Sequence, residues 1–414
     1  MTISIWITSV RSRQSRVSWD VNVGIERSLE LSNSDALVAE EMEAFAQREV
    51  LPYASSWDKA EAMDPEVIRS LSKRGWLGAL APEAYGGQDM DPLLWGRFCE
   101  SIGTASSSLL GLPTVHGMAI QAIARWGTDA QKETVLPMLA SGEAIGAFAL
   151  TEPEVGSDAA NVQTVAEATG SGFRLTGRKR WITFGNIANW FVVVARLEDK
   201  PTAFLVPSTN SGLKITPVKD MLGFRSAELA NLHFENCEVT EDAILGRPGF
   251  GFSHVAGTAL DHGRFCIAWG CVGLAQGCLS ASMEHAQERE QFGKPISEHQ
   301  LIQRLIADML VGTRAARGLC LEATALKRAG DPRVIMETSI AKYYASQHAA
   351  KASRDAVQIL GGTGCSSEGH VERYFRDAKV TEIIEGSSQI QQLIIARHGL
   401  MQHRKEKRKK ATNP

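Results

Sequence analysis

The feature that most constrains the fold is the hydrophobic period, which changes twice along the 414-residue chain. From about residue 35 to 146, apolar residues recur at helical spacing. Between residues 147 and 239, short apolar runs such as 191–195 are typical of strands. Beyond Gly249 helical spacing returns, with apolar residues of 301–310 at i, i+4 and i+8. The order is therefore helices, a β domain and a helical bundle, an α+β organisation.

This order predicts the domain boundaries. We expect a disordered N-terminal extension at 1–35, a helical domain at 36–146, a middle β domain at 147–248, a helical bundle at 249–400 and a basic tail at 401–414. The Arg-rich start also has a weak resemblance to a transit peptide. Alternating βαβ units and a GxGxxG turn are missing, so a Rossmann-type NAD dehydrogenase is disfavoured.

Composition excludes several classes of function. A net charge of −3 gives no basic field to attract nucleic acid, so nucleic acid is not an expected partner. We find no uninterrupted apolar window of the ~18 residues that a membrane span needs, so we expect no membrane association. The seven cysteines are odd in number and lack CxxC spacing, which indicates neither a disulfide framework nor a metal site and favours a reducing, cytoplasmic location.

Two stretches of the middle region have the composition of a cofactor site. An apolar strand runs into the turn Thr151-Glu-Pro-Glu-Val-Gly-Ser-Asp158, which can offer backbone N–H and hydroxyl donors to an anionic cofactor. Taken alone it is equally well a strand end with an Asp-capped turn. Trp181 and Thr183 follow two residues apart, which predicts one face of a strand against which a flat ring can lie.

The third stretch contains a candidate general base. Glu385 follows two isoleucines and precedes a glycine, so its carboxylate is expected in an apolar space that raises its pKa and makes it a better base at neutral pH. On spacing alone, the more common interpretation is a first-turn Glu, favoured by the dipole of a helix that starts at Ser387.

Together these stretches resemble the acyl-CoA dehydrogenase family over roughly residues 36–400. Five family motifs occur in the family's order: Thr-Glu-Pro-x-x-Gly-Ser-Asp, Lys-x-Trp-Ile-Thr, Glu-Arg-x-x-Phe-Gly-Lys-x-x-x-x-His-Gln, Gln-x-x-Gly-Gly-x-Gly and Ile-x-Glu-Gly-x-x-x-Ile-Gln. The resemblance implies an N-terminal helical domain, a middle β domain and a C-terminal four-helix bundle, with FAD as the cofactor.

The resemblance also implies which residues bind FAD and substrate. One group lies along the flavin and pyrophosphate: Phe148, Leu150, Thr151, Ser157, Trp181 and Thr183. A second group contacts the FAD of a neighbouring subunit, which implies a homodimer or homotetramer: Arg289, Gln291, Phe292, Gln358 and Gly362. Further cofactor contacts are implied at Ser387 and Gln389, and substrate contacts at Ser157, Arg264 and Gly386.

The implied reaction is the oxidation of an acyl thioester. Glu385 would remove the proton alpha to the carbonyl while the beta hydrogen leaves as hydride to flavin N5, and the N–H of Gly386 is a candidate donor to the thioester carbonyl. In one branch of the family the base lies on a bundle helix instead. Gly263 stands at that position here, so Glu385 is the only matched base.

Departures from the common pattern narrow the expected substrate. The segments 263–273, 368–373 and 382–388 look like a branch that acts on acyl carrier protein thioesters in hydroxymalonyl-type extender-unit biosynthesis for polyketides. Trp269 in the first segment is equally well a core tryptophan. A carrier protein is acidic, so basic residues such as Arg264 and the tail from Arg404 would help it to dock.

Other functions remain open on the sequence. One alternative is an ordinary short- or medium-chain acyl-CoA dehydrogenase, and another is a flavin oxidase or monooxygenase on the same fold. A catalytically dead scaffold would have lost the base or a flavin contact, and none is lost. The sequence does not indicate the electron acceptor.

Overall fold

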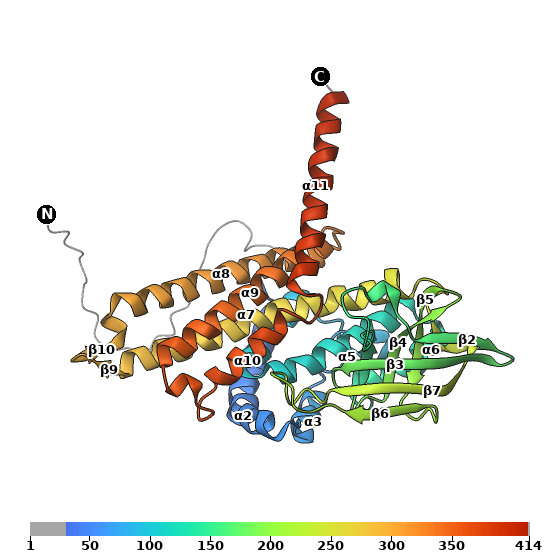
Figure 1. Ribbon diagram of the computed structural model, residues 1–414, viewed down its shortest axis with the longest axis horizontal. Helices are drawn as coiled ribbons and strands as arrows, with labels where there is room; N and C mark the ends of the chain where they lie inside the picture. Colours follow the sequence, from blue (N-terminus) through green and yellow to red (C-terminus); the bar gives the residue numbers. More distant parts are fainter. Residues whose placement is uncertain (1–29, 413–414) are drawn as a thin grey trace. The chain divides into compact units, whose positions relative to one another are not determined.

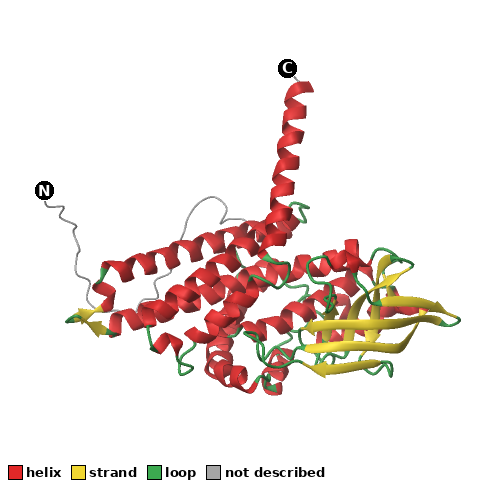
Figure 2. Ribbon diagram, in the orientation of Figure 1, coloured by secondary structure: helices red, strands yellow, loops and turns green. Residues whose placement is uncertain are grey.

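The computed structural model describes residues 30–412, in which a helical region, a sheet and a second helical region follow one another (Figures 1 and 2). The predicted α+β class is confirmed. Residues 1–29, most of the expected disordered extension, lie outside the described residues. The first helix begins at Asn33 with the Ser32 side chain as its N-cap, so helical structure starts slightly before the expected boundary at 36.

Capping side chains set the starts of the helices in the first region. Asp64 and Asp91 each stand directly before a proline and accept a hydrogen bond from a backbone N–H of the first turn. Thr128 and Gln131 form a reciprocal capping box. The helices are α1 (Asn33–Phe45), a π-helical turn (Ala46–Val50), α2 (Leu51–Ala60), α3 (Pro65–Lys73), α4 (Pro92–Ala105), α5 (Ser107–Trp126) and α6 (Asp129–Ser141).

Within the described residues, the middle region folds into one sheet with the strand order β6-β7-β3-β2-β4-β5-β8, and β1 pairs in parallel with β4. The apolar run at 191–195 is buried on both faces of the sheet, which explains why it does not alternate with polar residues. The strands are β1 (Gly146–Ala149), β2 (Val165–Thr169), β3 (Gly172–Ile182), β4 (Trp190–Leu197), β5 (Lys200–Pro207), β6 (Leu213–Pro217), β7 (Ala230–Thr240) and β8 (Ile244–Leu245).

The last region is the expected helical bundle, in which α7, α8 and α9 lie side by side and α10 packs on α7 and α9 (Figure 1). Small residues let α4 approach α7 closely, since a Cβ at Gly103 would lie 2.7 Å from the Gly270 Cα. After a π-helical turn (Gly251–Ala256), the elements are α7 (Gly257–Glu288), β9 (Glu290–Gln291), β10 (Lys294–Pro295), α8 (Gln300–Arg328), α9 (Val334–Leu360), α10 (Val371–Thr381) and α11 (Ser388–Thr412).

The segment expected as a separate basic tail continues α11, whose later turns extend away from the bundle (Figure 1). No glycine or proline follows Gly399 before Pro414, and the Lys, Arg, Glu and Gln residues of this stretch are good helix formers. Leu400 and Met401, at 61% and 55% exposure, show that these turns are not packed on the rest of the chain.

One further expectation is corrected by the structure. Trp181 and Thr183 do not share a strand face, because β3 ends at Ile182 and Trp181 has a left-handed backbone with φ +58°. The stretch 251–288 is long and apolar enough by length and composition to cross a membrane. Since 83% of its most apolar window is buried inside the protein, it is a core helix. Trp269 on this helix is a core tryptophan with no exposure.

Candidate active site

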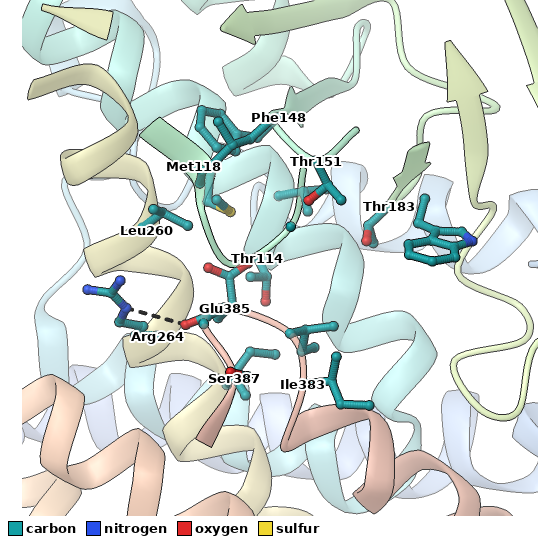
Figure 3. A pocket seen from close by; sticks show the side chains of 18 of the residues that line it. Thr114, Met118, Phe148, Thr151, Thr183, Leu260, Arg264, Ile383, Glu385 and Ser387 are labelled. Carbon is teal, nitrogen blue, oxygen red and sulfur yellow. Dashed lines mark hydrogen bonds between the residues drawn. The ribbon is translucent and has the colours of Figure 1, made fainter. Parts of the chain in front are cut away.

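A cavity of about 420 Å³ lies where the sheet meets the helices. It is lined by α5, by β1 with the loop that follows it, by the end of β3, by α7 and by the turn between α10 and α11 (Figure 3). On α5 the lining residues are Gly111, Thr114, Val115 and Met118, whose spacing places them on one face of the helix. Elements separated by more than 250 residues thus enclose one space.

Glu385 reaches into this cavity from a tight turn. It has φ +54° and the following Gly386 has φ +88°, so two successive residues adopt the left-handed conformation. The carboxylate oxygen Oε2 is buried and has no hydrogen-bond partner among residues 30–412. Burial raises the pKa of Glu385 to about 7, against the opposing effect of the positive charges of Arg264 and Lys342. The predicted apolar surroundings and raised pKa are both found, and a group with this pKa can accept a proton at neutral pH.

Gly263 on α7 makes the space that Glu385 occupies. A Cβ at this position would lie 2.5 Å from the carboxyl carbon of Glu385, closer than real side chains approach. A carboxylate could therefore not occupy both positions. The absence of a side chain at Gly263 is therefore what leaves room for the Glu385 carboxylate.

Donors from three different helices bind the carbonyl oxygens of the turn. Arg264 Nε on α7 donates to the Glu385 carbonyl at 3.3 Å, the bond drawn in Figure 3. Lys342 Nζ on α9 donates to the Gly386 carbonyl at 2.8 Å. Gln391 on α11 donates to the Glu385 carbonyl at 3.1 Å. A non-glycine residue held at positive φ persists only where its surroundings fix it, and these bonds do so.

A buried ion pair holds the loop after β1. Lys179 Nζ donates to Glu152 Oε1 at 2.7 Å and to the Leu150 carbonyl at 3.1 Å, and both side chains are almost fully buried. Glu152 Oε1 also accepts a hydrogen bond from the backbone N–H of Thr164 at 2.9 Å. Burial lowers the pKa of Lys179 to about 8, although Glu152 favours its charged form. The pair ties the loop 151–158 to β3, which keeps the hydroxyls of Thr151 and Ser157 at the cavity.

The residues expected along the flavin line this same cavity. Phe148, Leu150 and Ile182 supply apolar walls, while Thr151, Ser157 and Thr183 supply hydroxyls, and Trp181 remains 44% exposed at its side. The Arg180 guanidinium lies 4.3 Å from the Trp181 ring centroid. Apolar walls with hydroxyls at one edge suit a flat aromatic ring with polar atoms along one side, so the residues present fit the isoalloxazine of FAD.

The other predicted site residues divide into two groups. Arg264, Gly386 and Ser387 also line the cavity. Six predicted cofactor contacts do not, and all six are exposed: Arg289, Gln291, Phe292, Gln358, Gly362 and Gln389. Phe292, at the β9–β10 hairpin, is 94% exposed.

Sequence reasoning missed several residues of the site. Thr114 and Met118 on α5, Leu260 on α7 and Lys342 on α9 carry no motif around them. In the sequence they are ordinary residues of amphipathic or buried helices. The period of α5 alone could have shown which of its residues share a face, although not that this face borders a cavity.

Comparisons with known proteins agree with this geometry. The models of the acyl-CoA dehydrogenase N-terminal, middle and C-terminal domains match residues 32–143, 147–237 and 249–400. The mitochondrial short-chain specific acyl-CoA dehydrogenase of Homo sapiens is 38% identical over 387 residues, which are 92% of this chain and 93% of that protein.

Solved structures give the same result. Butyryl-CoA dehydrogenase from Megasphaera elsdenii aligns with a TM-score of 0.86 and 32% identity over 90% of this chain and 99% of that chain. FkbI, described as acting in biosynthesis of the methoxymalonyl extender unit of a polyketide, aligns with a TM-score of 0.80 and 31% identity over 89% and 99%. The chain belongs to the acyl-CoA dehydrogenase family and is an FAD-dependent oxidoreductase.

Proposed function

We propose that the chain dehydrogenates an acyl thioester with Glu385 as the general base. The observation that carries this proposal is the buried, unpartnered carboxylate oxygen of Glu385 inside the cavity. When bound, FAD accepts the beta hydrogen with its electron pair. Glu385 takes the proton from the alpha carbon, the two C–H bonds are replaced by a Cα–Cβ double bond, and the turn keeps the carboxylate directed at that carbon.

The negative charge that develops on the thioester carbonyl needs donors. The Gly386 N–H, next to the base in the cavity wall, is the donor we propose, and Ser157 and Arg264 are the further substrate contacts. Phe148, Leu150, Thr151, Trp181 and Thr183 are the residues that we propose hold the flavin ring, as their chemistry suits it, with Ser157 near the pyrophosphate.

The exposed group of predicted contacts supports an assembly. The FAD contacts proposed at Arg289, Gln291, Phe292, Gln358 and Gly362 would be completed by a second copy of the chain, as the family resemblance implies, and Gln389 is a further exposed cofactor contact that we propose. Phe292, at 94% exposure, offers an apolar ring that a second copy of the chain could cover. We propose a homodimer or homotetramer in which FAD lies at the interface.

Replacing Arg289 with alanine tests this assembly. Loss of one guanidinium from the proposed interface should weaken both FAD retention and subunit association. FAD retention would be measured by flavin absorbance after gel filtration, and association by analytical ultracentrifugation. Arg304→Ala, which removes an exposed guanidinium from α8, is the matched control. A monomer that binds FAD fully, with unchanged affinity in Arg289→Ala, would contradict the interface assignment.

We further propose that the acyl group is short and hydroxylated and is carried by an acyl carrier protein. A cavity of about 420 Å³ that must also admit part of a flavin leaves little room for a fatty chain. Thr114 puts a hydroxyl into the largely apolar α5 wall. Its Oγ1 donates a hydrogen bond to the Leu110 carbonyl oxygen at 2.8 Å, and the lone pairs of Oγ1 can accept a hydrogen bond from a substrate hydroxyl. The likeness to FkbI supports the same interpretation.

The helix α11 offers a surface for an acidic carrier protein. Its first turns, with Ile390 and Ile394, line the cavity, and the same helix continues into the basic segment 404–410. With six Lys and Arg residues and one Glu, this segment has the charge that attracts an acidic partner. We place the enzyme in polyketide extender-unit biosynthesis in the cytoplasm.

A specific observation also favours a second candidate, an ordinary short-chain acyl-CoA dehydrogenase. The Homo sapiens short-chain enzyme and the Megasphaera butyryl-CoA enzyme are as similar to this chain as FkbI, or slightly more similar. Both candidates share the fold, the base and the flavin, and they differ in the acyl group and its carrier.

Stopped-flow flavin reduction distinguishes the two candidates. We expect a three-carbon hydroxyacyl carrier protein to reduce the flavin faster than butyryl-, octanoyl- or isovaleryl-CoA, because a plain chain offers no donor to the lone pairs of the Thr114 hydroxyl. The carrier-protein reaction should slow as salt is raised, whereas the CoA reactions should change less. Faster reduction by any of the plain CoA esters would return the protein to ordinary acyl-CoA dehydrogenation.

A further inference from the structure

The turn that carries Glu385 rests on a buried lysine that the proposed reaction does not consume. Lys342 lies on α9, and its side chain has no solvent exposure. Its one hydrogen bond recorded among the described residues runs from Nζ to the Gly386 carbonyl at 2.8 Å. No carboxylate lies within ion-pair distance of the ammonium in the described part of the chain. A buried ammonium is costly, so its presence here calls for a function.

The position of Lys342 relative to the base suggests what that function is. Glu385 and Gly386 both have positive φ, and the carbonyls of these two residues accept bonds from Arg264, Lys342 and Gln391. The Glu385 side chain receives no comparable support, since its Oε2 has no hydrogen-bond partner in the part of the chain that the structure describes. The direction of the carboxylate is therefore set by the backbone of the turn, and the backbone is set by these donors.

Charge gives Lys342 a second effect on the base. The groups that face Glu385 and Lys342 are Arg264, Cys266 and Cys271 on α7 and Glu382 at the end of α10. His262 contacts Cys266, with 3.3 Å between Nε2 and Sγ. Arg264 and Lys342 are the positive groups that favour an ionised Glu385, and burial opposes them. Burial also lowers the pKa of Lys342 to about 8, so it is mostly charged at neutral pH.

We propose that Lys342 is a positioning residue for Glu385: it holds the strained turn so that the carboxylate points into the cavity, and its charge favours the ionised form of that carboxylate. This inference rests on the proposed role of Glu385 as the base. Lys342 lies behind the turn on α9, and no residue of α9 lines the cavity.

Two substitutions separate the two effects. Lys342→Gln removes the charge and retains an N–H donor, whereas Lys342→Met removes both from a side chain of similar length. The pH dependence of flavin reduction would be measured for both variants with the best substrate. Proton removal alone would be followed with a 3-thia acyl thioester, which loses its alpha proton without passing a hydride. Lys351→Met, the same change farther along α9, is the control.

We expect the pH midpoint of both reactions to move to higher pH by on the order of one unit in both Lys342 variants, because the carboxylate loses a nearby positive charge. The plateau rate at high pH should fall further in Lys342→Met than in Lys342→Gln, by about tenfold, because a displaced base is a poor one. If Lys342→Met does not fold, the midpoint of Lys342→Gln decides.

Unchanged midpoints in folded Lys342 variants, or a shift to lower pH, would overturn the proposal. Such a result would leave the role of Glu385 intact provided that Glu385→Gln abolishes flavin reduction. If Glu385→Gln reduces the flavin normally, the proposed function itself fails, so the two failures are distinguishable.

Discussion

Glu385→Gln is expected to fold, to retain FAD and to lose flavin reduction by acyl thioesters. The amide has nearly the shape of the carboxylate but cannot accept the alpha proton. Loss of a general base costs on the order of 10²–10⁴-fold in rate. The measurement is anaerobic stopped-flow at the flavin absorbance, and the flavin content of the purified variant is the control for cofactor binding. A variant that reduces its flavin close to the wild-type rate would place the base elsewhere.

The raised pKa of Glu385 adds a pH signature to this result. The wild-type reduction rate should rise through about pH 7, because the base must be ionised to act and burial raises its pKa to about 7. In the folded chain this pKa lies above the ordinary value, so the fold loses stability as pH rises through about 7 and the carboxylate ionises. Glu385→Gln avoids this loss, and its Tm at pH 8 should be equal to or higher than that of the wild type.

Gly263→Ala is expected to fold normally and yet lose most of its activity. The new Cβ would lie 2.5 Å from the Glu385 carboxyl carbon, and the nearest three atoms all belong to the Glu385 side chain. Since that side chain is flexible, it can move away at little cost to folding, while alanine in a helix interior is more favourable than glycine by about 1 kcal/mol. Displacing a reacting group by about 1 Å can cost on the order of 10²-fold in rate.

The matched control for this change is Gly257→Ala, at the start of the same helix. A Cβ at this position meets only the Phe252 carbonyl oxygen, at an ordinary 3.8 Å. Thermal unfolding and flavin reduction would be measured for both variants. A Gly263→Ala enzyme with wild-type rates would show that the carboxylate does not need the space above this glycine.

Part of this site could be read from local sequence. The periods of 35–146, 147–239 and the stretch after 249 were enough for the order of helices, sheet and helices, because each period reflects which faces of its own element are buried. The two isoleucines before Glu385 predicted its apolar surroundings for the same reason. Trp181 was the exception, because the irregular backbone at the end of β3 breaks the alternation on which that prediction depended.

What only the tertiary structure decided is which distant residues meet at the turn. Gly263, Lys342 and Glu385 belong to α7, α9 and the turn before α11, and neither their spacing nor their neighbours in the sequence relate them. A glycine within a helix and a lysine between an alanine and a tyrosine are each compatible with many packings. The roles of Gly263 and Lys342 depend on how closely the helices approach one another. That approach is determined by side-chain packing between elements far apart in the chain, and not by local conformational preferences.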